Sequence, residues 1–203
     1  MHLIGAGGHA KVVLEMLSEM GMTVHGIWDD NPSVKNLLGY PVLGSVMSLL
    51  ETNPQEVIVA IGNNDIRRKI ALQLRAKAAC AFSKTSSISL SAELGGGCVV
   101  MPNASINAGT RCGSHVIVNT NASVDHDCLL GDYVHISPQA GIAGNVEIGE
   151  GTHVGIGASV IQGLKIGKWC VIGAGAVVLK DLPDYAVAVG NPARIVKTNR
   201  YAK

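Results

Sequence analysis

The chain has 203 residues, which is enough for one large domain or two small ones. Its formal net charge is only +1, so it lacks the basic field that would hold the phosphates of a nucleic acid or a membrane surface. Aromatic residues make up 3% of the chain and Gly occurs 25 times, so the core has to be built from small aliphatic side chains. This composition favours a flat, repetitive architecture.

The cysteines and the apolar runs bear on where the protein works. Five cysteines are present, an odd number, and no CxxC spacing occurs, which is typical of reduced thiols. No apolar run approaches the roughly 20 residues that a membrane-spanning helix needs. The chain opens on a strand-like stretch with no visible targeting peptide. We therefore expect a cytoplasmic protein that does not insert into a membrane.

The first part of the chain alternates strands and helices. Residues 2–21 read as a strand, a glycine-rich turn and an amphipathic helix, and residues 23–30 read as a second strand that ends in acids. A third, buried strand follows at residues 56–64, and a second helix is expected at residues 65–77. Such alternation predicts a small parallel sheet, so residues 1–80 are expected to form a Rossmann-like unit.

The glycine-rich turn is a candidate nucleotide site. In the stretch from Gly5 to Lys11, glycines let the backbone approach an anion, and the following helix offers free N–H groups. Asp29 and Asp30 end the second strand, where an acid holds a ribose in dinucleotide-binding enzymes. A unit of this size has room for one nucleotide rather than a full dinucleotide. A tight turn that merely starts a helix remains the alternative.

Two asparagines follow the third strand. Asn63 and Asn64 could cap the next helix. They could equally face the crevice at the carboxyl end of a parallel strand, where ligands bind.

From Ile88 to Val178 an aliphatic residue returns every six positions, and only Cys112 breaks the Val, Ile and Leu series. Small or branched residues dominate four positions later. The spacing excludes an amphipathic helix, and the strands of a β-sandwich do not keep one spacing for so long. Short strands joined by turns explain it, with stacked coils that bury an aliphatic column. The pattern resembles the hexapeptide-repeat left-handed parallel β-helix, an all-β fold, in which three hexads make one triangular coil. We expect a short link at residues 81–87, roughly five coils, and a cap after Val178, within a second domain at residues 81–203.

Two histidines within the repeat are candidate catalytic residues. His126 lies between Asp125 and Asp127, and His135 follows nine residues later. Solvated surface histidines and a metal pair are the alternatives. A zinc site needs three or four converging ligands, and no acid or thiol recurs at that phase of the repeat, so we expect no metal.

Several motifs together resemble one enzyme family. They are IGAGGHAKVV, WDD and AIGNNDIRRKI, followed by hexads that carry VNTNASVDHDC and VHISPQAGIAGNVEIG. The chain resembles the sialic-acid O-acetyltransferase and bacillosamine-pathway sugar N-acetyltransferase family, and is most similar to UDP-4-amino-sugar N-acetyltransferases of bacterial glycan biosynthesis. The resemblance implies a Rossmann-like domain joined to a left-handed β-helix, with acetyl-CoA as co-substrate and a nucleotide sugar as acceptor.

The resemblance also assigns roles. It implies that His126 is the general base, Asp127 orients its imidazole, and the Gly144 N–H meets the thioester oxygen. It implies that His135 is a second active-site histidine and that Asn119 lies near the amine. It further implies contacts to the nucleotide sugar by Gly7, Gly8, His9, Asp29 or Asp30, and to acetyl-CoA by Gly144, Gly155, Gly173 and Ala174. Asn63 and Asn64 are further candidates for binding the nucleotide sugar. Some members have Glu where this chain has Asp beside His126, which leaves the roles of those acids open.

The repeat adds a geometric prediction. With eighteen residues per coil, His126 and Gly144 should stack at one corner, and His135 should stack on His153. His135 is half a coil from His126, on the opposite side of the prism. We therefore hypothesise that His126 of one subunit meets His135 of its neighbour in a homotrimer with active sites between subunits.

An imidazole suits the chemistry because the attacking amine or hydroxyl loses a proton as it meets the thioester. A sialic-acid or other sugar O-acetyltransferase stays open as an alternative, as does a non-catalytic β-helix binding module. The sequence names neither the sugar nor its nucleotide carrier.

Overall fold

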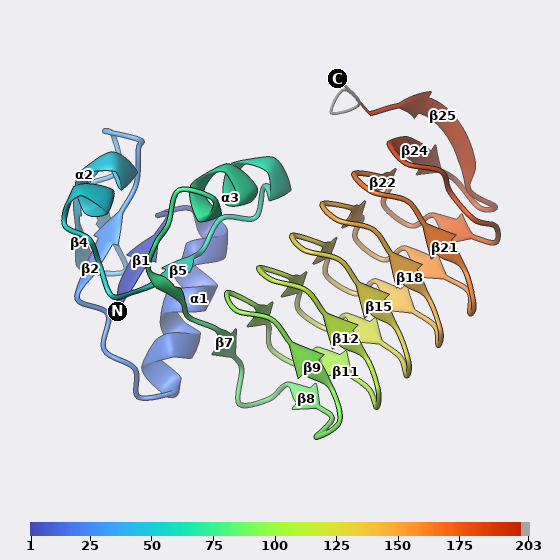
Figure 1. The fold of residues 1–203 in the computed structure, drawn as a ribbon, viewed down its shortest axis with the longest axis horizontal. Coiled ribbons are helices and arrows are strands. Elements are labelled where there is room, and N and C mark those ends of the chain that lie inside the picture. The colour runs from blue at the N-terminus through green and yellow to red at the C-terminus, as the bar shows by residue number, and fades with distance from the viewer. Residues whose placement is uncertain (200–203) are drawn as a thin grey trace.

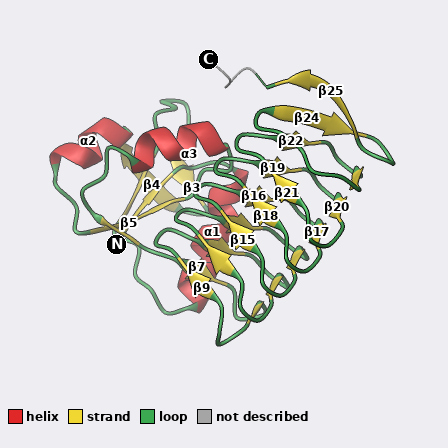
Figure 2. Ribbon diagram, turned by 45° about the vertical axis from the view of Figure 1, so that its right-hand side comes forward, coloured by secondary structure: helices red, strands yellow, loops and turns green. Residues whose placement is uncertain are grey.

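The computed structural model describes residues 1–199. An N-terminal α/β unit is followed by a three-sided solenoid of short strands (Figure 1). The strands of the N-terminal unit are β1 (His2–Ile4), β2 (Gly26–Trp28), β3 (Asn36–Leu37), β4 (Tyr40–Gly44), β5 (Glu56–Val59) and β6 (Lys77–Ala78). Its helices are α1 (Gly8–Glu19), α2 (Val46–Glu51) and α3 (Asn64–Ala71). Figure 2 shows all the helices of the described chain gathered in this unit.

The six strands of the N-terminal unit form one sheet in the order β3-β4-β2-β1-β5-β6. Every pairing is parallel except the hairpin between β3 and β4. Val57, Ile58 and Val59 of β5 are fully buried, as expected for a parallel strand that is covered on both faces. The predicted small parallel sheet, with a glycine-rich turn between its first strand and helix, is confirmed.

Two features of this unit differ from the sequence-based expectation. The β3–β4 hairpin and helix α2 were not predicted. The helix expected at residues 65–77 ends at Ala71, because Lys77 and Ala78 leave it to pair with β5. The partners in that pairing, Glu56 and Val57, are distant in sequence. Helical propensity alone could therefore not predict where the helix ends.

Three parallel sheets make the faces of the solenoid. Face 1 consists of β7 (Ala81–Phe82), β10 (Val99–Val100), β13 (Ile117–Val118), β16 (His135–Ile136), β19 (His153–Val154), β22 (Val171–Ile172), β24 (Ala186–Val189) and the antiparallel β25 (Arg194–Thr198). Face 2 consists of β8 (Ser87–Ile88), β11 (Ser105–Ile106), β14 (Ser123–Val124), β17 (Gly141–Ile142), β20 (Ser159–Val160) and β23 (Val177–Val178). Face 3 consists of β9 (Glu93–Leu94), β12 (Arg111–Cys112), β15 (Leu129–Leu130), β18 (Glu147–Ile148) and β21 (Lys165–Ile166).

The hexad pattern explains the solenoid core. Strands stack in register one coil apart, as Ser105 does on Ser123, so residues eighteen apart share one column. The aliphatic position of each hexad and the small position four residues later both point inward, and they form one continuous buried cluster. This confirms the predicted hexapeptide-repeat β-helix. The expected link at residues 81–87 is wrong, because Ala81–Phe82 already pairs with β10 as part of the first coil.

The N-terminal unit packs onto face 1. Leu14 of α1 shares a buried cluster with Val99 and Ile117 of that face. The side-chain amide of Asn64, at the start of α3, donates to the Gly151 carbonyl at 3.0 Å. The end of the solenoid is closed by β24, which pairs with β22, and by β25 folding back on it. Within residues 1–199, no helix has both the length and the apolar character to cross a bilayer.

Candidate active site

His126 lies in the turn between faces 2 and 3, beside an acid. Its Nδ1 is 2.8 Å from Oδ2 of Asp127. Because a carboxylate only accepts, Nδ1 carries the proton, and in the neutral ring Nε2 is bare. The bond to Asp127, followed by the charge of Asp125, raises the pKa of His126 above its ordinary value. The side chain is 53% exposed, so a proton acceptor with enhanced basicity stands at the surface.

Gly144 supports the His126 ring from the next coil. A Cβ built on Gly144 would lie 2.6 Å from both Cε1 and Nε2 of His126. The Asn145 N–H donates to the His126 carbonyl at 2.9 Å, which ties the two turns together. In the described part of the chain the Gly144 N–H makes no hydrogen bond. The predicted stacking of His126 on Gly144 is therefore present.

His135 occupies a buried position on face 1. Its Nδ1 is 3.1 Å from the Gly62 carbonyl and its Nε2 is 3.0 Å from Nδ2 of Asn119. Its ring centroid is 4.8 Å from that of His153, one coil along, which confirms the predicted pair. Burial, followed by the neighbouring His153 and Arg67, lowers the pKa of His135 to about 3. The environment of His135 thus favours the neutral ring, whereas that of His126 raises its pKa.

A cavity of about 640 Å³ lies between α3 and face 1. Six residues that the sequence singled out line it, namely Asn63, Asn64, His135, Gly155, Gly173 and Ala174. The column that holds Gly155 and Gly173 carries larger polar residues at earlier coils, Asn119 and Ser137. The wall therefore becomes bare backbone toward the C-terminal end, where an extended ligand arm could lie against it.

A second cavity, of about 460 Å³, lies in the N-terminal unit and meets the first at Gly62. The other residues predicted to bind the nucleotide sugar line it, namely Gly7, Gly8, His9, Asp29 and Asp30. Asp29 already accepts from the Ala6 N–H at 2.7 Å, and Asp30 from the Val46 N–H at 2.8 Å. The Nε2 of His9 has no hydrogen-bond partner among the described residues, and burial lowers the pKa of His9 to about 4.

The two asparagines after β5 have different environments. The Asn63 side chain accepts from the Ile66 N–H at 3.0 Å, so it caps α3 as one of the two alternatives expected. Asn64 is buried and reaches the carbonyls of Gly151 and Thr152 on the solenoid. Both also line the 640 Å³ cavity, so the capping role does not remove either from the candidate ligand site.

Within one chain, the predicted catalytic residues fall into two groups. His126, Asp127 and Gly144 lie at the turn between faces 2 and 3, whereas His135 and Asn119 lie at face 1. His126 lines neither of the two cavities described above. The sequence predicted this separation from the half-coil offset.

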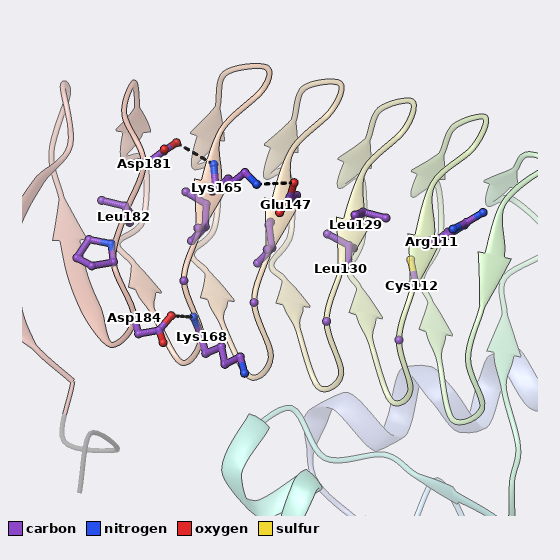
Figure 3. Close-up of a pocket in the computed structure, with 17 residues that line it drawn as sticks. Arg111, Cys112, Leu129, Leu130, Glu147, Lys165, Lys168, Asp181, Leu182 and Asp184 are labelled. Carbon is purple, nitrogen blue, oxygen red and sulfur yellow. Dashed lines mark hydrogen bonds and ion pairs between the residues drawn. The ribbon is translucent and has the colours of Figure 1, made fainter.

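The groove on face 3 is larger, at about 910 Å³, but it contains none of the predicted site residues. Figure 3 shows one ion pair and two carboxylate contacts to backbone N–H groups between successive coils of this groove. Lys165 is 3.1 Å from Glu147, and the Asp181 carboxylate accepts from the Lys165 N–H at 2.9 Å. Since none of the predicted site residues lies in this groove, we do not place the chemistry there. Among residues 1–199, no three or more His, Cys, Asp or Glu side chains converge as a metal site would require.

Arg67 was missed by the sequence analysis. It is 1% exposed and touches both the N-terminal unit and the solenoid. The sequence hint was an arginine four residues after Asn63 in a short helix, and nothing in that pattern distinguishes it from the exposed Arg68.

Comparisons with known proteins place the chain in a family. The model of the PglD N-terminal domain matches residues 1–74, and that of the bacterial transferase hexapeptide repeat matches residues 145–180. A solved structure of a GDP-perosamine N-acetyltransferase variant from Caulobacter crescentus, in complex with CoA and GDP-perosamine, is 41% identical. It has a TM-score of 0.92 over 97% of this chain and 96% of that one. The chain belongs to the hexapeptide-repeat sugar N-acetyltransferases.

Two further solved structures of acetyltransferase type or similar fold resemble this chain. The acetyltransferase domain of PglB from Neisseria gonorrhoeae, solved with acetyl coenzyme A, is 42% identical with a TM-score of 0.89, over 96% of this chain and 98% of that one. WeeI from Acinetobacter baumannii is 32% identical with a TM-score of 0.88, over the same shares. The chain spans only 20% of a curated relative, an uncharacterized protein of Acanthamoeba polyphaga mimivirus, which is 32% identical over 98 residues, 48% of this chain.

Membership of this N-acetyltransferase family settles two of the expectations from the sequence. The protein is an acetyltransferase, and acetyl-CoA is its co-substrate. The alternative of a non-catalytic β-helix module is set aside on the same finding.

Proposed function

We propose that this N-acetyltransferase transfers the acetyl group of acetyl-CoA to the amino group of a nucleotide-linked 4-amino-deoxy sugar. The observation that carries the proposal is the His126 site: an imidazole with a bare Nε2, held by Asp127 and lying over the unpaired N–H of Gly144. The solved relatives contain CoA, acetyl-CoA or a nucleotide-linked sugar, which supports the same pair of substrates.

The proposed reaction is a direct attack. The sugar amine adds to the thioester carbonyl carbon while Nε2 of His126 takes the proton that the nitrogen loses. The former carbonyl oxygen gains negative charge, which the Gly144 N–H would stabilise. The carbon–sulfur bond then breaks, and the imidazolium returns its proton to the leaving thiolate. Asp127 stabilises the imidazolium, so no covalent acyl-enzyme is needed.

The sugar and the CoA have separate places in this proposal. Gly7, Gly8, His9, Asp29 and Asp30 would hold the nucleotide sugar in the 460 Å³ cavity, because their loop combines close backbone approach with a helix N-terminus. The wall formed by Gly155, Gly173 and Ala174 would hold the pantetheine arm, since it presents backbone rather than side chains. Asn63 and Asn64, which also line the 640 Å³ cavity, would contact the sugar.

We further propose that the enzyme is a homotrimer in which His126 of one subunit faces His135 and the CoA wall of the next. The exposure of His126 and the separation of the two groups in one chain support this arrangement. Face 2 also presents a column of mostly small outward residues that would let a neighbour approach closely. These are Ser87, Ser105, Ser123, Gly141, Ser159 and Val177. The reduced, core-packed cysteines fit a cytoplasmic enzyme.

A thiol-release assay tests the proposal. The enzyme is given acetyl-CoA with a UDP-linked 4-amino sugar, with GDP-perosamine or with free sialic acid. We include both nucleotides because the sequence resemblance implies UDP, whereas the Caulobacter structure holds a GDP sugar. Thiol release that matches the loss of a sugar amine supports the proposal. Release with sialic acid alone would instead establish O-acetylation, and silence with every amino sugar would refute the acceptor class.

A further inference from the structure

Arg67 is a buried cation that no acid neutralises. All five of its N–H groups donate to neutral oxygens, and no carboxylate within residues 1–199 forms an ion pair with it. Nε donates to the His115 carbonyl at 3.0 Å and Nη2 to the Tyr133 carbonyl at 2.8 Å, on successive coils. Burial lowers the pKa of Arg67 to about 10, so the guanidinium stays charged at neutral pH. Placing an unpaired charge in the interior is costly, which suggests a use for it.

The remaining donors of Arg67 fix the loop that separates the two cavities. Nη1 donates to the carbonyls of Ile61 at 2.9 Å and Gly62 at 3.1 Å, and Nη2 donates to Oδ1 of Asn64 at 3.0 Å. The Gly62 carbonyl is also the partner of His135 Nδ1. Arg67 therefore holds in place the oxygen that holds the His135 ring.

Two independent contacts fix the tautomer of His135. The Gly62 carbonyl only accepts, so Nδ1 carries the proton. On the other side, Oδ1 of Asn119 accepts from the Thr120 N–H at 2.8 Å, which orients the amide so that Nδ2 donates to Nε2. The first contact requires a proton on Nδ1 and the second requires a bare Nε2, so together they define a neutral His135 with its proton on Nδ1.

We propose that Arg67 is a positioning residue of this enzyme: through the Gly62 carbonyl it holds His135 in the Nδ1–H tautomer, with a bare Nε2 turned toward Asn119, and its charge adds to the burial that disfavours a cationic ring. The guanidinium acts in two ways. Its charge disfavours a second positive charge on the ring, and its planar donors set the position of the carbonyl. The catalytic consequence rests on the function proposed above, because it assumes that His135 and Asn119 lie near the reacting amine.

The other groups around His135 do not replace Arg67 in this role. His9 of α1 and His153 of β19 face the ring, but each is itself held neutral by burial and by Arg67. Asp65, which lines the same cavity, is paired with Lys69 at 2.7 Å. Arg67 is thus the permanent charge of the cluster.

Nuclear magnetic resonance of ¹⁵N-histidine-labelled enzyme, without substrates, tests the proposal directly. The His135 signals are assigned by their loss in His135→Asn. In the wild type we expect Nδ1 of pyrrole type and Nε2 of pyridine type, unchanged between about pH 5 and about pH 8. An Nε2–H tautomer, or a cationic ring anywhere in that range, overturns the proposal without any Arg67 variant.

Two variants separate the charge of Arg67 from its geometry. Arg67→Met removes both, so the His135 pKa should rise above its wild-type value and the two tautomers should mix. Arg67→Lys keeps the charge but offers three donors instead of five, so the pKa should stay low while the two tautomers mix. Arg68→Lys is the matched control, since Arg68 is the next residue and pairs with Glu150 on the surface. His135 signals that remain as in the wild type in a folded Arg67→Lys or Arg67→Met refute the proposal.

Kinetics then tests the catalytic consequence. We expect kcat to fall by about 10²-fold in Arg67→Lys, as for a misplaced active-site group, with little change in the acetyl-CoA KM. Arg68→Lys should retain wild-type kcat. If the wild type releases no thiol with any sugar, the proposed function fails while the resonance result still stands. If thiol is released but Arg67→Lys is fully active, the positioning role fails alone. Should Arg67→Met not fold, the wild-type and Arg67→Lys spectra decide.

Discussion

The imidazole of His126 rests on Gly144, one coil further along the solenoid, so closely that a Cβ at position 144 would lie 2.6 Å from Nε2. The two residues are brought together by the eighteen-residue register rather than by local sequence. The ring is exposed and held from the side by Asp127, so the glycine sets how near the ring can lie to the backbone. This relationship makes the site sensitive to very small changes.

Replacing His126 by Gln should abolish most of the activity. The variant removes the proton acceptor while keeping a polar side chain at an exposed position, so the fold should be unaffected. We expect kcat to fall by about 10²–10⁴-fold, the usual contribution of a general base. Acetyl-CoA affinity, measured by calorimetry, should stay close to that of the wild type. His25→Gln, at another exposed histidine, is the control. A fall of less than threefold would remove His126 from the mechanism.

Gly144→Ala should impair catalysis without unfolding the protein. The new methyl group needs the space that the His126 ring occupies, and the ring can move outward because it is exposed. We expect a loss in kcat of about 10²-fold, since small displacements of a reacting group have effects of that size. Wild-type activity in a folded Gly144→Ala would contradict the proposed contact.

Asp127→Asn should shift the pH profile of kcat/KM. The Asp127 carboxylate is the main cause of the raised pKa of His126, because it stabilises the imidazolium. The base works only when neutral, so wild-type activity rises with pH through this raised pKa. Removing the carboxylate lowers the pKa, so the acidic limb should move to lower pH, and the plateau should fall because the base is weaker. Asn tolerates the positive φ of 58° at this position.

Asp181→Asn provides the comparison for that experiment. Asp181 lies in the face 3 groove, where its side chain accepts from the Lys165 N–H. Its pH profile should overlay that of the wild type. An unshifted acidic limb in Asp127→Asn would mean that another group controls the profile.

Asn63 allows its two roles to be separated. Asn63→Ala removes the cap of α3 and should lower the free energy of unfolding by about 1 kcal/mol, measured by urea denaturation. Asn63→Asp keeps an N-cap oxygen and should retain stability. If Asn63 also contacts the sugar, both variants should raise the KM for the nucleotide sugar. A normal KM in Asn63→Asp would leave this residue with the capping role alone.

The repeat explains why so much of the solenoid could be predicted from the sequence. A side chain at each hexad position has the same neighbours one coil away, so spacing alone places His126 on Gly144 and His135 on His153. The period also predicted the inward aliphatic column. The same periodicity failed at its first coil, where Ala81 pairs with Val99 although residues 81–87 were predicted to be a linker.

Contacts between the two units could not be predicted in the same way. Arg67 reaches carbonyls at positions 115 and 133, and Asn64 reaches position 151, through packing that no period encodes. The burial of His135 has the same origin, because the Gly62 loop covers it from the N-terminal unit. Sequence spacing placed His135 on its face of the prism but gave no indication that a neighbouring domain keeps it neutral.

The shared-site arrangement predicts how mixed trimers behave. His126→Ala and His135→Ala are co-expressed in equal amounts, and the whole population of trimers is assayed without fractionation. If each site takes His126 from one subunit and His135 from the next, some sites combine two intact residues. At equal proportions with random assembly, about one quarter of the sites should be active, since the interface is heterologous. If both histidines must come from one chain, activity should stay at the level of the single variants.

The double variant supplies the matched control for subunit mixing. In equal mixtures of wild type with His126→Ala/His135→Ala, a shared site is intact only when both neighbouring subunits are wild type. Activity per subunit should then fall to about one quarter of the wild-type value, against about one half for sites within one chain. The shared site and the single-chain site therefore predict different pairs of activities for the two mixing experiments. One quarter in both supports the shared site, whereas zero in the first and one half in the second places the active site within a single subunit.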